Sequence, residues 1–153
     1  MNRNRIRSFT YGALLLFGAS TAGAQEFANL GELLDKGGKR LDAVELEALV
    51  TGATSSGTTL RPGSTVETEV TFGADGKATG RLYGPQFHAL ADPDMRGTWR
   101  ISEQQLCTEM FARAFGQLKT CVGYYILNNV YYAAASEDRG AIVRSRKVKQ
   151  QSR

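Results

Sequence analysis

The sequence has few of the residues that build most catalytic and metal sites. Its 153 residues include one histidine, two cysteines and one tryptophan. The single histidine, His88, has no second imidazole with which to build a transition-metal site, and no Gly-x-Ser-x-Gly nucleophile elbow accompanies it. No complete set of nucleophile, base and orienting residue is present. We therefore predict that the protein is not an enzyme and that it holds no cofactor or metal.

Two acidic residues follow the histidine closely, at Asp92 and Asp94. A His–Asp pair can activate a water or a serine hydroxyl, and two carboxylates can contact Ca²⁺, which prefers oxygen ligands. Together with Met95, however, the cluster mixes hard and soft ligands, a combination that suits no common metal. We interpret these side chains as a solvated surface loop.

Long apolar runs are also lacking. The apolar stretch at residues 11–18 is far shorter than the roughly 20 residues that cross a bilayer as a helix. It follows a start with three arginines and precedes Ala22-Gly-Ala24, a pattern typical of a secretory signal with a small-residue cleavage site. We predict a signal peptide at residues 1–24, cleavage near Ala24, a periplasmic or secreted product, and no stable membrane span.

The excess of positive charge is confined to the two ends of the chain. The whole sequence has 19 basic and 15 acidic residues, but residues 1–24 contribute three of the basic ones and residues 144–153 another five. The remaining body has 11 basic and 15 acidic residues. An acidic body lacks the basic face of a nucleic-acid-binding protein, so we predict no nucleic-acid partner. Residues 149–153 are interpreted as a solvated basic tail.

The two cysteines, Cys107 and Cys121, both follow the predicted signal peptide. In an exported protein an even cysteine count favours a disulfide bond, and two cysteines allow one connectivity. Their spacing differs from that of a Cys-x-x-Cys metal site, and no histidine lies beside them. We predict a structural Cys107–Cys121 bridge.

Helical signals are restricted to the segment after the signal peptide. Residues 25–40 have apolar residues at spacings of three and four, which predict a short helix or an irregular arm. Residues 42–50 predict an amphipathic helix, because Asp42 can cap its start, Glu45 completes a capping box and Gly52 follows its end. We expect this helix to cover or plug another part of the fold.

From residue 54 onward the pattern becomes that of β-strands. Asp75-Gly76 and Asn128-Asn129 are pairs that form tight hairpin turns between such segments. Residues 111–119 also fit a helical face, and we interpret them as a loop or a single helical turn. The pattern predicts a mainly β domain at residues 41–148, with about seven short strands in a small antiparallel β-barrel or sandwich after the short N-terminal helix.

Aromatic residues form the best candidate binding surface. Consecutive tyrosines on a strand point to opposite faces, so one of each pair is expected in the core and the other on the surface. An exposed set suits a glycan, a lipid-like ligand or a protein, whereas strands packed on both faces would bury it. The candidates are Trp99, Tyr124, Tyr125, Tyr131 and Tyr132.

Several of these motifs together resemble a group of small exported bacterial proteins of unknown function. The resemblance covers residues 41–135 and is carried by the Phe72–Gly76 hairpin, by Gly97-Thr-Trp99 and by the two cysteines. It implies a small β-rich extracytoplasmic domain and brings no catalytic residues. Gly97-Thr-Trp99 also resembles the triplet near the first strand of lipocalins, although here it lies past the middle of the chain.

Two functions are compatible with these features. The first is an exported, non-enzymatic binding or accessory protein of the bacterial cell envelope, whose partner is an envelope protein or a glycan. The second is a lipocalin-like carrier of a small apolar ligand. A carrier needs a cavity of several hundred cubic ångströms, whereas an accessory domain should be filled by side chains.

Overall fold

The computed structural model describes residues 25–84, 95–113 and 115–151. The predicted signal peptide and the cluster of His88, Asp92 and Asp94 lie outside these residues. Two helices and nine strands follow in the order α1 (Leu30–Asp35), β1 (Lys39–Arg40), α2 (Ala43–Val50), β2 (Ala53–Thr58), β3 (Glu67–Phe72), β4 (Lys77–Tyr83), β5 (Met95–Ser102), β6 (Gln105–Ala112), β7 (Gly116–Leu127), β8 (Val130–Ala134) and β9 (Val143–Gln150).

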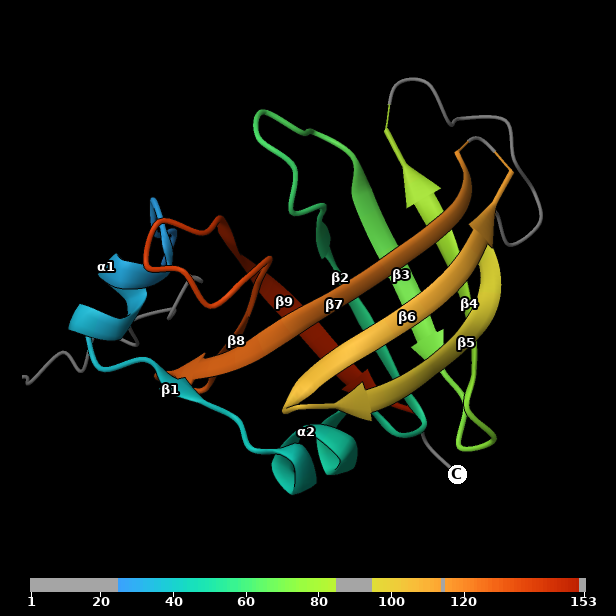
Figure 1. Cartoon of the computed structure of the whole chain (residues 1–153), viewed down its shortest axis with the longest axis horizontal. Coiled ribbons are helices and arrows are strands. Elements are labelled where there is room, and N and C mark those ends of the chain that lie inside the picture. Colours follow the sequence, from blue (N-terminus) through green and yellow to red (C-terminus); the bar gives the residue numbers. More distant parts are fainter. Residues whose placement is uncertain (1–24, 85–94, 114, 152–153) are drawn as a thin grey trace, which may run out of the picture.

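Strands β2 to β9 form a closed eight-stranded antiparallel barrel (Figure 1). Each strand pairs with its neighbours in the chain, and pairing of β2 with β9 closes the ring. Strand β1 is an addition to this ring, because its two residues pair with the end of β7. The prediction of a mainly β fold with about seven strands in a barrel or sandwich is confirmed, and the architecture is a barrel of eight strands with one additional strand.

Strand β7 changes partners along its length. Residues 116–122 pair with β6, and residues 123–127 pair with β8. Strand β8 has only five residues, so in the described part of the chain no strand pairs with the second edge of residues 116–122. The barrel wall is therefore incomplete beside the first half of β7.

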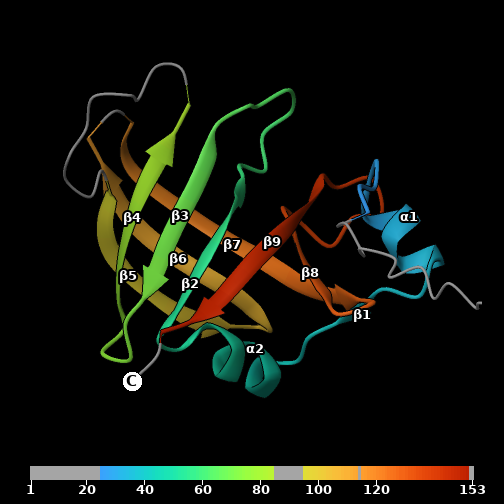
Figure 2. The ribbon, with the colours of Figure 1, turned by 180° about the vertical axis from the view of Figure 1, so that it is seen from behind.

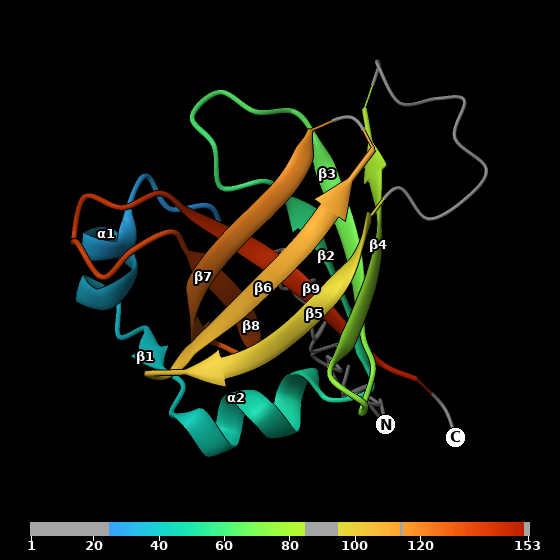
Figure 3. The same ribbon diagram turned by 45° about the vertical axis from the view of Figure 1, so that its right-hand side comes forward.

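Helix α2 closes one end of the barrel, as Figures 1 and 3 show. Its start has the predicted capping box, in which Asp42 Oδ1 accepts from the Glu45 amide at 2.8 Å and Glu45 Oε2 accepts from the Asp42 amide at 3.0 Å. Leu46 and Val50 are fully buried among the inward side chains of the strands. The helix thus plugs the barrel, as its amphipathic pattern predicted.

The N-terminal arm covers the outside of the barrel beside β8 and β9, where α1 is seen in Figure 2. Phe27 packs edge-on against Tyr132 with ring centroids 5.3 Å apart, and Leu30 and Leu33 are buried in the same cluster. Burial raises the pKa of the Tyr132 and Tyr125 hydroxyls above their ordinary value of 10.0. A second, smaller core therefore lies outside the barrel.

Two local predictions are corrected by the strand pairing. Residues 111–119 were expected as a loop or a helical turn, but residues 111–112 end β6 and residues 116–119 begin β7. The predicted tail also begins inside a strand, because Lys149 pairs with Thr54 and Gln150 with Ala53. In both places pairing with a neighbouring strand overrides the local pattern, since it satisfies a row of backbone hydrogen bonds.

The disulfide bond between Cys107 and Cys121 is confirmed. The two residues lie directly opposite each other on β6 and β7. The bond therefore links two strands that also line the barrel interior on their other face.

Replacing both cysteines by serine should lower the free energy of unfolding by about 3 kcal/mol, because the bond closes a loop of roughly 15 residues in the unfolded chain. Urea titration measures the change, and a thiol assay of the native protein should find no free thiol. The neighbouring cross-strand pair Thr108 and Thr120, joined by one 3.3 Å hydrogen bond, provides the control. The double alanine variant of that pair should cost less than about 1.5 kcal/mol. An equal loss in both double variants would contradict a covalent contribution.

The plug formed by α2 can be tested within the same helix. Leu46→Ala should destabilise the protein by about 2–5 kcal/mol, since it leaves a cavity beneath a fully buried side chain. Val44 is 77% exposed, and Val44→Ala should change stability by less than about 0.5 kcal/mol. Equal effects in thermal or urea unfolding would show that the helix does not pack into the barrel end.

Candidate functional site

A cavity of about 490 Å³, partly open to solvent, lies inside the barrel. This volume lies within the range of about 300–1,000 Å³ that is typical of small-molecule sites. Residues from β3 to β9 and from the loop between β2 and β3 line it: Thr59, Leu60, Arg61, Ser64, Val66, Thr68, Val70, Phe72, Leu82, Met95, Leu106, Thr108, Met110, Phe115, Leu118, Lys119, Thr120, Val122, Tyr124, Ala133, Ala135 and Arg146.

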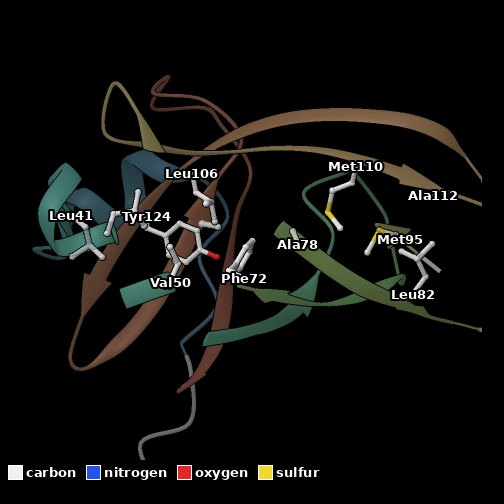
Figure 4. Close-up of a cluster of buried hydrophobic side chains, with 12 residues drawn as sticks. Leu41, Val50, Phe72, Ala78, Leu82, Met95, Leu106, Met110, Ala112 and Tyr124 are labelled. Atoms are coloured by element: carbon white, nitrogen blue, oxygen red, sulfur yellow. The ribbon is translucent and has the colours of Figure 1, made fainter. Parts of the chain in front are cut away.

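Most of the cavity wall is apolar, because the strands alternate between inward apolar and outward polar residues. Strand β4 has this pattern throughout, with Ala78, Gly80 and Leu82 buried and the residues between them exposed. In Figure 4, Leu82, Met95 and Met110 lie together on one side of Phe72, and Tyr124 and Leu106 lie on the other. Phe72, Leu106 and Tyr124 belong to the same cluster as the buried residues of α2 and form the floor of the cavity.

Two glycines allow the strands to pack closely at this wall. A Cβ on Gly80 would lie 2.7 Å from Cε of Met95, which would push that side chain further into the cavity. A Cβ on Gly97 would collide with the Glu109 carbonyl oxygen on β6. The glycine of the Gly97-Thr-Trp99 triplet is therefore explained by close approach of β5 to β6.

A small polar network interrupts the apolar wall. Ser55 is fully buried, and its Oγ lies 3.0 Å from the hydroxyl of Tyr124. Arg146 donates from Nε to Ser55 Oγ, from Nη1 to the Thr58 carbonyl and from Nη2 to Thr68 Oγ1, each at 3.3 Å. The guanidinium group thus joins β9 to β2 and β3, and the Ser55–Tyr124 contact extends the network to β7.

The charged residues of the cavity lining are Arg61, Lys119 and Arg146, and all three are cationic. Lys119 pairs with Glu109, and the hydrogen bond and charge of Lys119 lower the pKa of the Glu109 carboxyl group. The guanidinium carbon of Arg61 lies 5.8 Å from the ring centroid of Phe115. Lys119 lies on the outward face of β7 and its charge is balanced by Glu109, so Arg61 and Arg146 supply the positive charge beside a mostly apolar lining.

The five aromatic residues predicted from sequence do not share one exposed surface. Tyr124 faces the barrel interior and lines the cavity, and Tyr131 packs from the same side. Tyr125 and Tyr132 face outward but are 3% and 2% exposed, because the N-terminal arm covers them. Trp99 packs edge-on against Phe72, with centroids 5.9 Å apart, and its Nε1 donates to the Gly73 carbonyl at 2.8 Å. The expected exposed set is corrected, since the strands are covered on both faces.

Sequence reasoning missed Arg146 as a site residue. It was counted with the basic residues near the end of the chain. The alternation of inward and outward residues along β9 could have indicated it, because Val148 and Arg146 share the inward face. Val148 pairs with Ser55 on β2, and Arg146 pairs with Tyr131 on β8. That signal depends on knowing that β9 is a strand.

Other types of site find no support in residues 25–84, 95–113 and 115–151. Within these ranges no three His, Cys, Asp or Glu side chains gather as a group that could hold a metal ion. The same residues include no helix that is long and apolar enough to cross a membrane.

In comparisons with known proteins, no family model, no curated protein and no solved structure matches the chain. The class of protein is therefore defined by structure, as a closed eight-stranded antiparallel β-barrel with one disulfide bond. Trp99 stands on β5, the fourth strand of this barrel. The lipocalin triplet that it resembles stands near the first strand, so the two do not occupy equivalent places.

The polar network can be tested by removing its hydroxyl groups. Ser55→Ala should destabilise the protein by about 1–3 kcal/mol, because the buried Tyr124 hydroxyl loses its partner. Combining it with Tyr124→Phe should cost less than the two single changes added together, since both partners are then apolar. A double-mutant cycle in urea measures this coupling, and additive costs would contradict a direct Ser55–Tyr124 bond.

Proposed function

We propose that the protein is an exported, non-enzymatic carrier that binds a small apolar ligand inside its barrel. The observation that supports this most strongly is the cavity of about 490 Å³ with a mostly apolar lining. An accessory domain that acts only through its surface would be expected to have an interior filled by side chains. Of the two functions compatible with the sequence, the cavity favours the carrier.

The position of the cavity supports ligand exchange. Helix α2 closes one end of the barrel, and the loop at residues 59–66 and the β6–β7 hairpin lie at the opposite end (Figure 3). Residues of this loop and Phe115 of the hairpin line the cavity. A ligand would enter at this end or beside residues 116–122 of β7.

The hydrophobic effect would supply most of the affinity. Each buried methylene contributes about 0.8 kcal/mol, and a tenfold change in affinity corresponds to about 1.4 kcal/mol. Affinity should therefore rise by roughly tenfold for every two methylenes added to a ligand, until the cavity is full. This gives the carrier a preference for chains of a particular length.

Export is part of the proposal. The basic, apolar and small-residue pattern of residues 1–24 supports it, as does a disulfide bond, which forms and persists in oxidising compartments. We place the protein in the periplasm or outside the cell, where an apolar molecule needs a carrier to cross water.

Filling the cavity should abolish binding. The neutral fluorescent probe N-phenyl-1-naphthylamine should bind the protein saturably with increased emission. Leu118→Trp places a larger ring in the cavity and should weaken probe binding at least tenfold, because Leu118 lines it. Gln117→Trp is the matched control, since Gln117 is exposed and faces away on the same strand.

The outcomes of this titration separate cavity binding from surface adsorption. The control variant should bind the probe with the affinity of the unmodified protein. Absence of saturable binding, or equal binding by both tryptophan variants, would overturn the carrier proposal. Far-ultraviolet circular dichroism of both variants checks that the barrel is retained.

A further inference from the structure

The cavity has two chemically different sides. In the ring of strands β2 to β9, β9 is four strands away from β5 in either direction, so these two strands face each other across the barrel. Strand β9 contributes Arg146, whereas β4, β5 and β6 contribute Leu82, Met95 and Met110. One wall is therefore cationic and the opposite wall is apolar.

Arg146 has hydrogen-bond donors to spare. A guanidinium group carries five N–H donors. Three of them are directed at Ser55 Oγ, the Thr58 carbonyl and Thr68 Oγ1, which are all uncharged oxygens. Two N–H groups remain for a further acceptor.

Among the residues that the structure describes, Arg146 also has no counter-ion. No carboxylate oxygen of these residues lies within 4.0 Å of its guanidinium group, whereas five ion pairs form between other residues of the described chain. The cavity lining contains no acidic residue among its described members. A partly buried cation beside apolar walls loses hydration, and an anion placed beside it would offset that loss.

We propose that the ligand is an amphiphile with an anionic head group, which binds Arg146, and with an apolar chain, which lies along Leu82, Met95 and Met110. This inference rests on the proposed carrier function and names its ligand class. Guanidinium groups pair with carboxylate and phosphate through two parallel N–H bonds. Arg61 lies in the same lining and adds a positive charge that attracts such a ligand.

A purely structural role for Arg146 makes a different prediction. Its bond to the Thr58 carbonyl joins β9 to β2 beside Gly57, where the pairing between these strands ends. If that were its whole role, replacing Arg146 would lower stability but would leave the choice among ligands of equal chain length unchanged. The discriminating quantity is therefore a ratio of affinities within one protein.

The test compares ligands that differ only in their head group. Isothermal titration calorimetry measures dodecanoate, dodecyl phosphate, dodecanol and dodecyltrimethylammonium on the protein produced from the full chain, with acetate as the head group without a chain. We expect dodecanoate or dodecyl phosphate to bind at least tenfold more tightly than dodecanol. The cation should bind more weakly than dodecanol, and acetate should not compete.

These results distinguish failure of the inference from failure of the carrier function. If no twelve-carbon ligand binds, the carrier proposal fails and this inference fails with it. If dodecanol binds as tightly as both anions, the carrier proposal stands and the anionic head group is excluded. If acetate binds as tightly as dodecanoate, the apolar chain contributes nothing, and the inference of an amphiphilic ligand fails in favour of a simple anion site.

Variants then assign the preference to Arg146. In Arg146→Gln the ratio of dodecanoate to dodecanol affinity should fall to about one, whereas Arg146→Lys should keep part of it through its charge. Lys147→Gln removes the same charge from the next residue, which is exposed, and should leave the ratio unchanged. An unchanged ratio in Arg146→Gln, or an equal fall in Lys147→Gln, would overturn the role of Arg146. The comparison of ligands on the unmodified protein keeps the inference testable if Arg146→Gln does not fold.

Discussion

Closure of the sheet by β2 and β9 is the constraint on which the rest of the structure depends. The pairing joins residues 53–56 to residues 147–150, so almost the whole β domain lies between the two partners. Gln150 reinforces it by donating to the Leu49 carbonyl at 2.8 Å, which ties the closing strand to α2. Bringing such distant strands together costs loop-closure entropy, and the hydrogen bonds and apolar burial gained on closure must offset this cost. An open sheet would leave two long edges and no interior.

The interior follows from closure together with the uneven lengths of the strands. Eight strands leave room for either packed side chains or one small ligand. Helix α2 fills one end with Leu46 and Val50, while the short β8 leaves part of β7 without a second partner in the described chain. The cavity thus lies where a wall is incomplete. On the opposite side of β9, the three hydrogen bonds of Arg146 link that strand to β2 and β3.

Local signals in the sequence were sufficient wherever the physics is local. The capping box of α2 depends on Asp42 and Glu45 alone, and the turn at Asn128-Asn129 depends on two residues that tolerate positive φ. The disulfide bond followed from a count of two cysteines. The β6–β7 hairpin was missed because Phe111, Phe115 and Leu118 also fit a helical spacing, and only pairing with neighbouring strands decides between the two patterns.

The sequence by itself determined a mainly β domain, its covering helix, its disulfide bond and the residue types available for a site. Tertiary structure alone decided which faces are covered and which residues meet. Tyr125 and Tyr132 are buried because a segment about a hundred residues earlier in the chain packs over them. Arg146 becomes a cavity residue because β9 closes the barrel with its inward face toward Ser55. Neither result follows from local pattern, since the free energy that selects it comes from contacts between residues far apart in the chain.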